Sequence, residues 1–432
     1  MDLGTADVDS TGPIFISYRQ SDGTEIVQEL AWLLRAAGLP VWRDRDDLPP
    51  GDTNERLKQA IDEGISGGVL VITPDIRHSK VVKTVEAPRL LRLHQMYPAF
   101  ALGIANSVQQ DSGGLDYHAP DRLLSLDSET LRGVDQQPTD RQGLQQLLQR
   151  LLWNRIACQR DRVETDAHTF SLSVQTRNTP QVYDRTGCQL DIRVRPSEHE
   201  RLPGAAGLTD LQHTLGLLPD AVTRSGAQRV RIHGGAHLSV AFAVGTALPS
   251  TRIGAIEVVD QREAIWASSS EAQHSRVPYI QVAAQETSLN TSERARPTVA
   301  VYLDLLPQRS DAAFERFLAE HAGSIHAWRH LTSTCGELLD PAEAGAIASD
   351  AAAHIRSFSN NNDNATVHLL LRCPFPLALL LGRLTNTIRF VAYEWDDSQA
   401  TETGDDFRPR YVPALRVRAS ALGGPIHEVL LD

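Results

Sequence analysis

Short apolar runs alternate with helical patterns over the first hundred residues, and this alternation constrains the fold more than any other feature. The run at 14–18 (IFISY) is typical of a buried strand, and apolar residues then recur at helical spacing over 26–37. Gly38 follows where a helix would end, and further strands are predicted at 39–42 and 68–73. The pattern predicts a doubly wound parallel sheet, in which ligands bind beyond the carboxyl ends of the strands.

The size and charge of the chain exclude several classes of protein. Its 432 residues exceed one ordinary core, so two or three domains are expected. No run approaches the roughly 18 apolar residues that span a bilayer, and the first residues lack the parts of a signal peptide. A net charge of −12 argues against DNA or RNA polymers as partners, because phosphate binding needs a basic face.

The cysteines are few, and none forms a C-x-x-C pair: Cys158, Cys188, Cys335 and Cys373. Neither a zinc site nor a disulfide framework is predicted, and we expect no metal and no cofactor. Reduced thiols fit a cytoplasmic protein best.

Polar side chains follow the predicted strands and would meet at the carboxyl edge of the sheet: Tyr18, Arg19, Asp44 and Thr73. A lone glutamate, Glu86, comes shortly after Ser79 in the segment beyond the third strand. On position alone, such a glutamate is a solvated helix carboxylate in most proteins. Closing strands are predicted at 99–104 and 122–126, with an amphipathic helix over 141–157.

The IFISY strand, the GLPVWRD segment at 38–44, the LPPG loop at 48–51 and Glu86 together resemble a Toll/interleukin receptor (TIR) domain of the bacterial, NAD-cleaving kind. The resemblance implies a flavodoxin-like domain over 1–158, with Glu86 as its catalytic residue. Cleavage at the nicotinamide–ribose bond releases a leaving group that is already a pyridinium cation, so no general acid is needed. One carboxylate beside the ribose can stabilise the oxocarbenium-like transition state.

The resemblance also implies the residues that bind NAD: Tyr18, Arg19, Trp42, Asp44, Leu48 and Ser79. It makes 43–52 a gating loop that packs against a neighbouring TIR domain, so activity would require assembly. The segment 80–85 lacks the aromatic residue of many bacterial relatives, which leaves nicotinamide stacking to Tyr18, Trp42 or another residue. Trp42, like Trp32, can equally be a core or rim aromatic.

The second half contains an internal repeat, because Gly245 and Gly382, 137 positions apart (382 − 245), belong to a series of matches at this spacing. A strand, loop, helix and strand over 228–257 reappear over 367–394. The charged stretch at 159–168 is predicted to be a linker. The matched pairs are Ala241/Ala378, Gly245/Gly382, Arg252/Arg389, Ala255/Ala392, Glu257/Glu394 and Asp260/Asp397.

This half resembles a SAVED domain in four segments: 367–369, 377–384, 392–395 and 411–415. The resemblance implies a sensor over 169–432 built from two fused CARF-like, Rossmann-type halves, about 169–290 and 291–432. SAVED domains bind cyclic oligonucleotides made by a partner nucleotidyltransferase during phage infection. The chain is thereby identified as a TIR-SAVED effector of cyclic-oligonucleotide-based antiphage signalling (CBASS).

Loops that enter helices are the expected nucleotide contacts, because helix N-termini offer free N–H groups and a positive dipole end. Glycines permit close approach, Ser239 can cap its helix, and Phe375 can stack a base. The strands at 190–195 and 298–305 are predicted to open each half and to end in polar loops. The arginines can instead be surface residues, the glycine pair a simple turn, and Phe375 a core residue. The candidates are Arg195, Ser197, Gly234, Gly235, His237, Ser239, Gln308, Arg309, Arg372, Pro374 and Phe375.

These expectations combine into a ligand-activated NAD+ glycohydrolase with no membrane partner. A cyclic oligonucleotide, more readily a trinucleotide than a di- or tetranucleotide, would drive head-to-tail self-association into a filament or ring. NAD+ would then be cleaved to nicotinamide and ADP-ribose or a cyclised form. The alternative is a non-enzymatic TIR adaptor or scaffold, which has no need of Glu86. A flavodoxin-like redox protein is disfavoured because no G-x-G-x-x-G follows the first strand.

Overall fold

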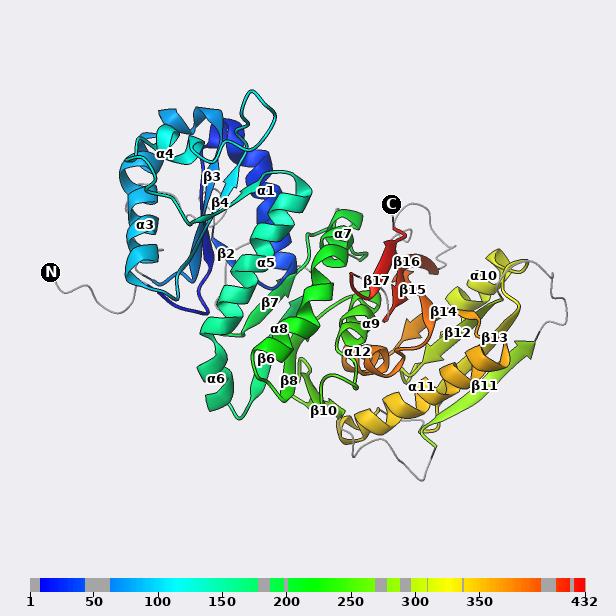
Figure 1. Ribbon diagram of the computed structural model, residues 1–432. Coiled ribbons are helices and arrows are strands. Elements are labelled where there is room, and N and C mark those ends of the chain that lie inside the picture. The colour runs from blue at the N-terminus through cyan, green and yellow to red at the C-terminus, as the bar shows by residue number, and fades with distance from the viewer. Residues whose placement is uncertain are drawn as a thin grey trace. The chain divides into compact units, whose positions relative to one another are not determined.

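The computed structural model describes residues 8–42, 63–177, 187–197, 201–268, 278–287, 297–308, 310–335, 338–397, 409–419 and 423–431. The chain forms two compact units (Figure 1). The first contains Met1–His168, Pro180–Arg193 and Arg224–Gly226, and the second contains Thr169–Thr179, Val194–Thr223 and Ala227–Asp432. Among the described helices, none combines the length and apolar character required to cross a bilayer.

The first unit is built on a parallel sheet with the strand order β2-β1-β3-β4-β5. Figure 1 shows α3 on one face of this sheet and α1 and α5 on the other. The strands predicted at 14–18, 39–42, 68–73 and 99–104 are confirmed within two residues at each end. The strands are β1 (Ile14–Ser17), β2 (Val41–Trp42), β3 (Gly67–Ile72), β4 (Ala101–Asn106) and β5 (Asp135–Pro138).

The helices of this unit cover the sheet with apolar side chains. Asp140 is the N-cap residue of α5. The Asp140 carboxylate accepts the N–H of Gly143 at 2.8 Å, which satisfies one of the free donors at the helix start. Part of the segment after β3 is a π-helix, η2. The elements are α1 (Gln20–Ala36), η1 (Pro74–His78), η2 (Val82–Glu86), α3 (Ala87–Met96), α4 (Ala119–Leu124), α5 (Arg141–Cys158) and α6 (Arg160–Thr165).

One prediction in this unit is wrong. The strand expected at 122–126 is the end of α4 and the turn after it, and the closing strand is β5. β5 has the sequence DQQP and is half-buried along its length, so it carries no hydrophobic signal. Within the predicted linker at 159–168, residues 160–165 form the helix α6, on which Val163 is fully buried.

The first half of the second unit has parallel strands β6, β8 and β9, with β10 antiparallel to β9. The prediction that 190–195 opens this half is wrong: β6 lies beside β8. β6 comes first in the chain, and the segment 190–193 is the edge strand β7 (Leu190–Arg193) in the sheet order β10-β9-β8-β6-β7. The elements of this half are β6 (Thr169–Gln175), α7 (Ala205–Thr214), η3 (Leu215–Leu217), α8 (Leu218–Arg224), β8 (Arg229–Gly235), α9 (Leu238–Ala247), β9 (Ala255–Val259) and β10 (Ile265–Ser268).

The second half has a seven-stranded sheet with the order β11-β13-β12-β14-β15-β16-β17. β11 (Ile280–Thr287) is part of this sheet, although it precedes the predicted boundary near 290. The predicted strand–loop–helix–strand repeat is present as β8-α9-β9 and β14-α12-β15. The remaining elements are β12 (Thr298–Asp304), α10 (Ala312–Glu320), β13 (Ala327–Ser333), η5 (Pro341–Glu343), α11 (Ala344–Asn361), β14 (Thr366–Arg372), α12 (Phe375–Leu384), β15 (Arg389–Asp396), β16 (Arg410–Arg418) and β17 (Ile426–Val429).

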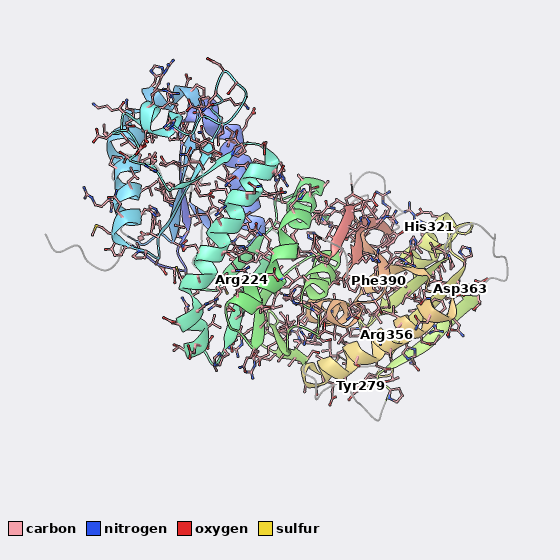
Figure 2. The ribbon with its side chains drawn as sticks, in the orientation of Figure 1. Arg224, Tyr279, His321, Arg356, Asp363 and Phe390 are labelled. Atoms are coloured by element: carbon pink, nitrogen blue, oxygen red, sulfur yellow. The ribbon has the colours of Figure 1, made fainter. Side chains whose placement is uncertain are left out.

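The repeated helices α9 and α12 pack against each other, and a glycine lies on each side of their crossing. A Cβ on Gly245 would collide with the carbonyl of Leu379, and one on Gly382 would collide with the carbonyl of Phe242. Phe242 also packs edge-on against Phe390 of β15, labelled in Figure 2, with ring centroids 4.9 Å apart. The glycine match in the repeat is therefore explained by close helix packing.

Candidate functional site

The Glu86 carboxylate lies at the carboxyl edge of the first sheet. It follows β3 through η2, and its Oε2 accepts the hydroxyl proton of Ser17 at 2.5 Å. Ser17 is the last residue of β1, which pairs directly with β3. Both side chains are buried, with 1% of Ser17 and 9% of Glu86 exposed. Glu86 is thus a buried, hydrogen-bonded carboxylate rather than the solvated helix residue of the simpler interpretation.

A hydrogen-bond network fixes the two loops that flank this edge. Asp22, at the start of α1, accepts the Thr73 hydroxyl at 2.8 Å and the Asp75 N–H at 3.0 Å. Arg19 donates to the carbonyl of Asp75 at 2.8 Å. The segment after β1 is therefore held to the segment after β3, and Arg19 lies at the predicted edge.

The other predicted NAD contacts have different placements. Tyr18 and Ser79 are half-buried, and the Ser79 hydroxyl accepts the Val82 N–H at 3.4 Å. Trp42 is a core residue, 7% exposed, whose ring stacks on Phe15 at 5.2 Å. The ring thus packs in the core, the second of the two interpretations given for this residue. Two of the predicted contacts fall outside the described residues, as does the predicted gating loop: Asp44 and Leu48.

Two adjoining cavities lie in the second unit, with volumes of about 480 and 740 Å³. They are formed where the loops β8–α9, β9–β10 and β14–α12 meet, so equivalent loops of the repeat line one region. Ligand pockets in proteins have volumes of the same order. The residues shared by both cavities are Gly234, Gly235, Asp260, Gln261 and Phe375.

The two cavities differ in chemistry. The smaller one has an apolar wall, on which Leu306 and Leu338 are 40% and 72% exposed, together with Trp266. The larger one is lined by polar groups, including Arg177 and His233. The same lining also holds the carboxylates of Asp260 and Glu263, so its charges are of both signs. An apolar wall beside one that carries an arginine can take a ligand with flat rings and a phosphate.

Four of the predicted nucleotide contacts line the cavities: Gly234, Gly235, Pro374 and Phe375. Gly234 has a φ of +109°, and a Cβ there would collide with the carbonyl of Val174. At Gly235 the nearest atom to an added Cβ is the Gln261 amide nitrogen, at 4.0 Å. Gly234 thus maintains the backbone path, whereas Gly235 leaves room beside the cavity.

The start of α9 already has a hydrogen-bond partner, the side chain of Glu394. The Ser239 N–H donates to the buried Glu394 carboxylate at 2.6 Å, and burial raises the pKa of that carboxyl. The N-cap is His237 rather than Ser239, and its Nδ1 lies 2.8 Å from the Thr176 hydroxyl oxygen. Burial, with a smaller effect from Arg177, lowers the pKa of His237 to about 4. A ligand phosphate at this helix end would have to compete with Glu394.

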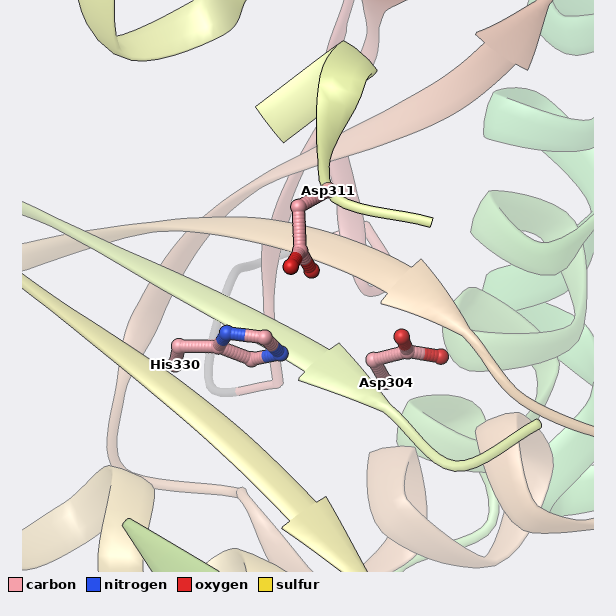
Figure 3. Close-up of side chains that lie close together, drawn as sticks. All are labelled: Asp304, Asp311 and His330. Atoms are coloured by element: carbon pink, nitrogen blue, oxygen red, sulfur yellow. The ribbon is translucent and has the colours of Figure 1, made fainter. Parts of the chain in front are cut away.

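Two predicted arginine contacts are in ion pairs. Arg372 donates to Asp304 at 2.7 Å, and Arg195 lies 3.0 Å from Asp210. Asp304 also belongs to a cluster with Asp311 and His330 (Figure 3), whose possible metal-ligand atoms lie within 4.8 Å of one another. Arg372 already supplies positive charge to this cluster. Ser197 and Gln308 do not line the cavities, and Arg309 lies outside the described residues.

Most of the cavity residues were not predicted, among them Arg177, Gln261, Arg262 and Trp266. Arg177 follows β6, whose alternating sequence TFSLSVQ places three residues fully in the core. Recognising this strand would have placed Arg177 at the carboxyl edge. The other three belong to the β9–β10 hairpin, where Asp260 accepts the Trp266 indole N–H at 2.9 Å.

Two family models match the chain. The model described as "TIR domain" matches residues 14–97. The model described as "SMODS-associated and fused to various effectors sensor domain", abbreviated SAVED, matches residues 215–417. The chain carries a TIR domain and a SAVED domain. Both resemblances in the sequence are confirmed, and with them the mixed α/β fold class.

The TIR domain is similar to part of one curated protein, the NAD(+) hydrolase PdTIR of Paracoccus denitrificans (strain Pd 1222). The two are 41% identical over 73 residues, which is 16% of this chain and 23% of the relative. The chain therefore matches less than a quarter of the length of that relative.

Solved structures similar to the chain are Cap4 SAVED/CARF-domain containing receptors. The receptor of Acinetobacter baumannii with the cyclic trinucleotide 2′3′3′-cAAA is 14% identical, with a TM-score of 0.45 over 92% of this chain and 98% of that one. The receptor of Moraxella osloensis is 13% identical, with a TM-score of 0.39 over 91% and 97%.

Proposed function

We propose that this protein is an NAD+ glycohydrolase that a cyclic oligonucleotide activates through the SAVED domain. The observation that carries the proposal is the buried Glu86 carboxylate, 2.5 Å from the Ser17 hydroxyl oxygen, at the ligand-binding edge of a TIR sheet. The partial similarity of the TIR domain to an NAD+ hydrolase supports the same reaction. A TIR adaptor would need no buried carboxylate at this position.

The reaction requires one carboxylate of the protein and no general acid. Nicotinamide leaves as a neutral molecule from a pyridinium, so Glu86 acts by stabilising the positive charge that develops on the ribose. The ribose carbon then bonds to water, which gives ADP-ribose, or to another atom of the same molecule, which gives a cyclised form. Tyr18, Arg19 and Ser79 are the proposed NAD+ contacts in the described part of the chain, and the segment 43–52 is the proposed gating loop.

The activator is proposed to be a cyclic trinucleotide that occupies both cavities. Its bases would contact Phe375, Trp266 and the apolar wall, where stacking is independent of base sequence. Its phosphates would pair with Arg177 and Arg262, which line the two cavities. Neither arginine was among the contacts expected from the sequence. Gly235 lets the backbone approach the ligand closely.

Binding is proposed to drive head-to-tail self-association, which brings TIR domains together and starts NAD+ cleavage. Such heterologous contacts produce filaments or rings. We place this reaction in the bacterial cytoplasm as part of CBASS antiphage defence, where it would deplete NAD+. The four cysteines are free thiols, in keeping with a reducing compartment.

The catalytic part is tested by nicotinamide release from NAD+, measured against a panel of cyclic di-, tri- and tetranucleotides. We expect the wild type to respond best to a trinucleotide, and Glu86→Gln to lose at least about 100-fold in kcat, in the range of a lost transition-state stabiliser. Glu25→Gln, on the exposed face of α1, is the matched control and keeps the wild-type rate. Wild-type turnover by Glu86→Gln would refute the assignment.

The sensing part is tested by calorimetric titration of the trinucleotide that activates. Gly235→Glu introduces a carboxylate beside the cavity, so we expect affinity to fall by tenfold or more, about 1.4 kcal/mol. Gly323→Glu makes the same change at an exposed glycine with open space around it and should bind like the wild type. Equal affinities for the two variants would contradict the placement of the ligand.

A further inference from the structure

Glu86 is held from two sides. Its backbone belongs to a π-helical turn, in which the N–H of Ala87 donates to the carbonyl of Val82, five residues earlier. In an α-helix each residue turns the chain by about 100°, and the backbone hydrogen bonds join residues four apart. The wider π-helical turn therefore changes the direction in which the Glu86 side chain points from the backbone. Its carboxylate end is held by the Ser17 hydroxyl, from a different strand.

The contact between these two side chains is buried. Ser17 is 1% exposed and lies at the end of β1, where parallel pairing with β3 fixes its backbone. A glutamate side chain has three rotatable bonds, and a donor at a fixed position restricts the last rotations. Hydrogen bonds to charged groups contribute more than neutral ones, and more still away from water.

We propose that Ser17 is a positioning residue for NAD+ cleavage, whose hydroxyl holds the Glu86 carboxylate in the orientation that faces the developing charge on the ribose. This role rests on the proposed function. Ser17 acts through Glu86 and does not itself touch the substrate. Because the carboxylate is needed in the transition state, loss of its orientation lowers kcat more than it raises KM.

The test uses the full chain with NAD+ and the cyclic nucleotide that activates the wild type best in the panel. Ser17→Ala should lower kcat by about 10- to 100-fold, the value of a hydrogen bond to a charged group, with KM within about twofold. Ser17→Thr keeps the hydroxyl and should recover most of the rate. Ser17→Cys keeps the side-chain size with a weak donor and should stay close to Ser17→Ala.

A double-mutant cycle separates positioning from packing. If Ser17 acts only through the carboxylate, Ser17→Ala/Glu86→Gln should be no slower than Glu86→Gln alone, because the two changes remove one interaction. Additive losses would overturn the proposal, as would wild-type kcat in Ser17→Ala or in Ser17→Cys. Should Ser17→Ala fail to fold, Ser17→Cys and Ser17→Thr decide: equal rates in these two variants would also overturn it.

The same experiment distinguishes this inference from the function on which it rests. A wild type that cleaves no NAD+ with any ring in the panel, or a Glu86→Gln variant with the wild-type rate, removes the enzymatic function and the role of Ser17 with it. An inactive Glu86→Gln variant beside a fully active Ser17→Ala variant leaves the function in place and rejects the positioning role alone.

Discussion

Two buried histidines in the SAVED domain make its stability depend on pH. The pKa of His237 is lowered to about 4, first by burial and then by Arg177, and burial lowers that of His368 to about 4 as well. In the unfolded chain both rings bind a proton near pH 6.5. The folded state then binds fewer protons than the unfolded state, so stability is present above about pH 6.5 and is lost as the pH falls toward 4.

The contribution of His237 to this pH dependence of stability can be measured. Each such histidine lowers the free energy of unfolding by about 1.4 kcal/mol per pH unit between its two pKa values. Urea unfolding at pH 7.5 and 5 should therefore show a smaller pH-dependent loss in His237→Asn than in the wild type. His78→Asn, at an exposed residue of η1, is the control and keeps the wild-type difference. An unchanged difference in His237→Asn would contradict the buried, neutral ring.

The residues that sequence reasoning placed well are those whose signal is local. Glu86 was predicted from the resemblance to TIR domains, in which the glutamate follows the third strand closely, and Gly235 because it lies in a loop between a strand and a helix. Arg372 and Ser239 depend on distant partners: Asp304 is 68 residues from Arg372, and Glu394 is 155 residues from Ser239. Spacing along the chain contains no information about such pairs.

At the scale of elements, the crossing of α9 and α12 makes a prediction about packing. Gly382→Ala forces a methyl group against the carbonyl of Phe242, so the helices must separate or shift. Overpacking of this kind costs about 1 to 3 kcal/mol, from which the higher helix propensity of alanine recovers up to about 1 kcal/mol. Chemical unfolding measures the loss, with Gly323→Ala as the control because nothing lies within 4 Å of its Cβ. Equal stabilities would show that the crossing is looser than described.

Elements were predictable where hydrophobic periodicity marks them. β1 and β3 consist of buried residues that are apolar apart from Ser17, and both were expected within a residue or two of their ends. β5 is a strand of polar residues at a sheet edge, held by pairing with β4 rather than by its own apolar side chains. β6 was missed although its alternation is clear, and that omission also hid Arg177. The failures thus concern an edge strand and a strand overlooked beside a charged segment.

At the scale of the whole molecule, the proposed switch implies reciprocity between ligand binding and assembly. If the cyclic trinucleotide favours the assembled state, assembly must favour the trinucleotide by the same factor, because both belong to one thermodynamic cycle. The apparent Kd of the ligand should therefore fall as the protein concentration rises through the assembly range. A ligand that binds the two states equally would shift nothing, however tightly it binds.

This reciprocity is measured with a fluorescent cyclic trinucleotide titrated at two protein concentrations about 100-fold apart, with light scattering to record assembly. For a coupling of 1 to 3 kcal/mol, usual for linked sites, the apparent Kd should decrease by about 5- to 150-fold. Glu86→Gln removes the reacting carboxylate and leaves the SAVED cavity intact, so it should show the same decrease without releasing nicotinamide. A constant Kd, in a protein that nonetheless cleaves NAD+ on ligand addition, would place the activation inside a single chain and reject assembly as the switch.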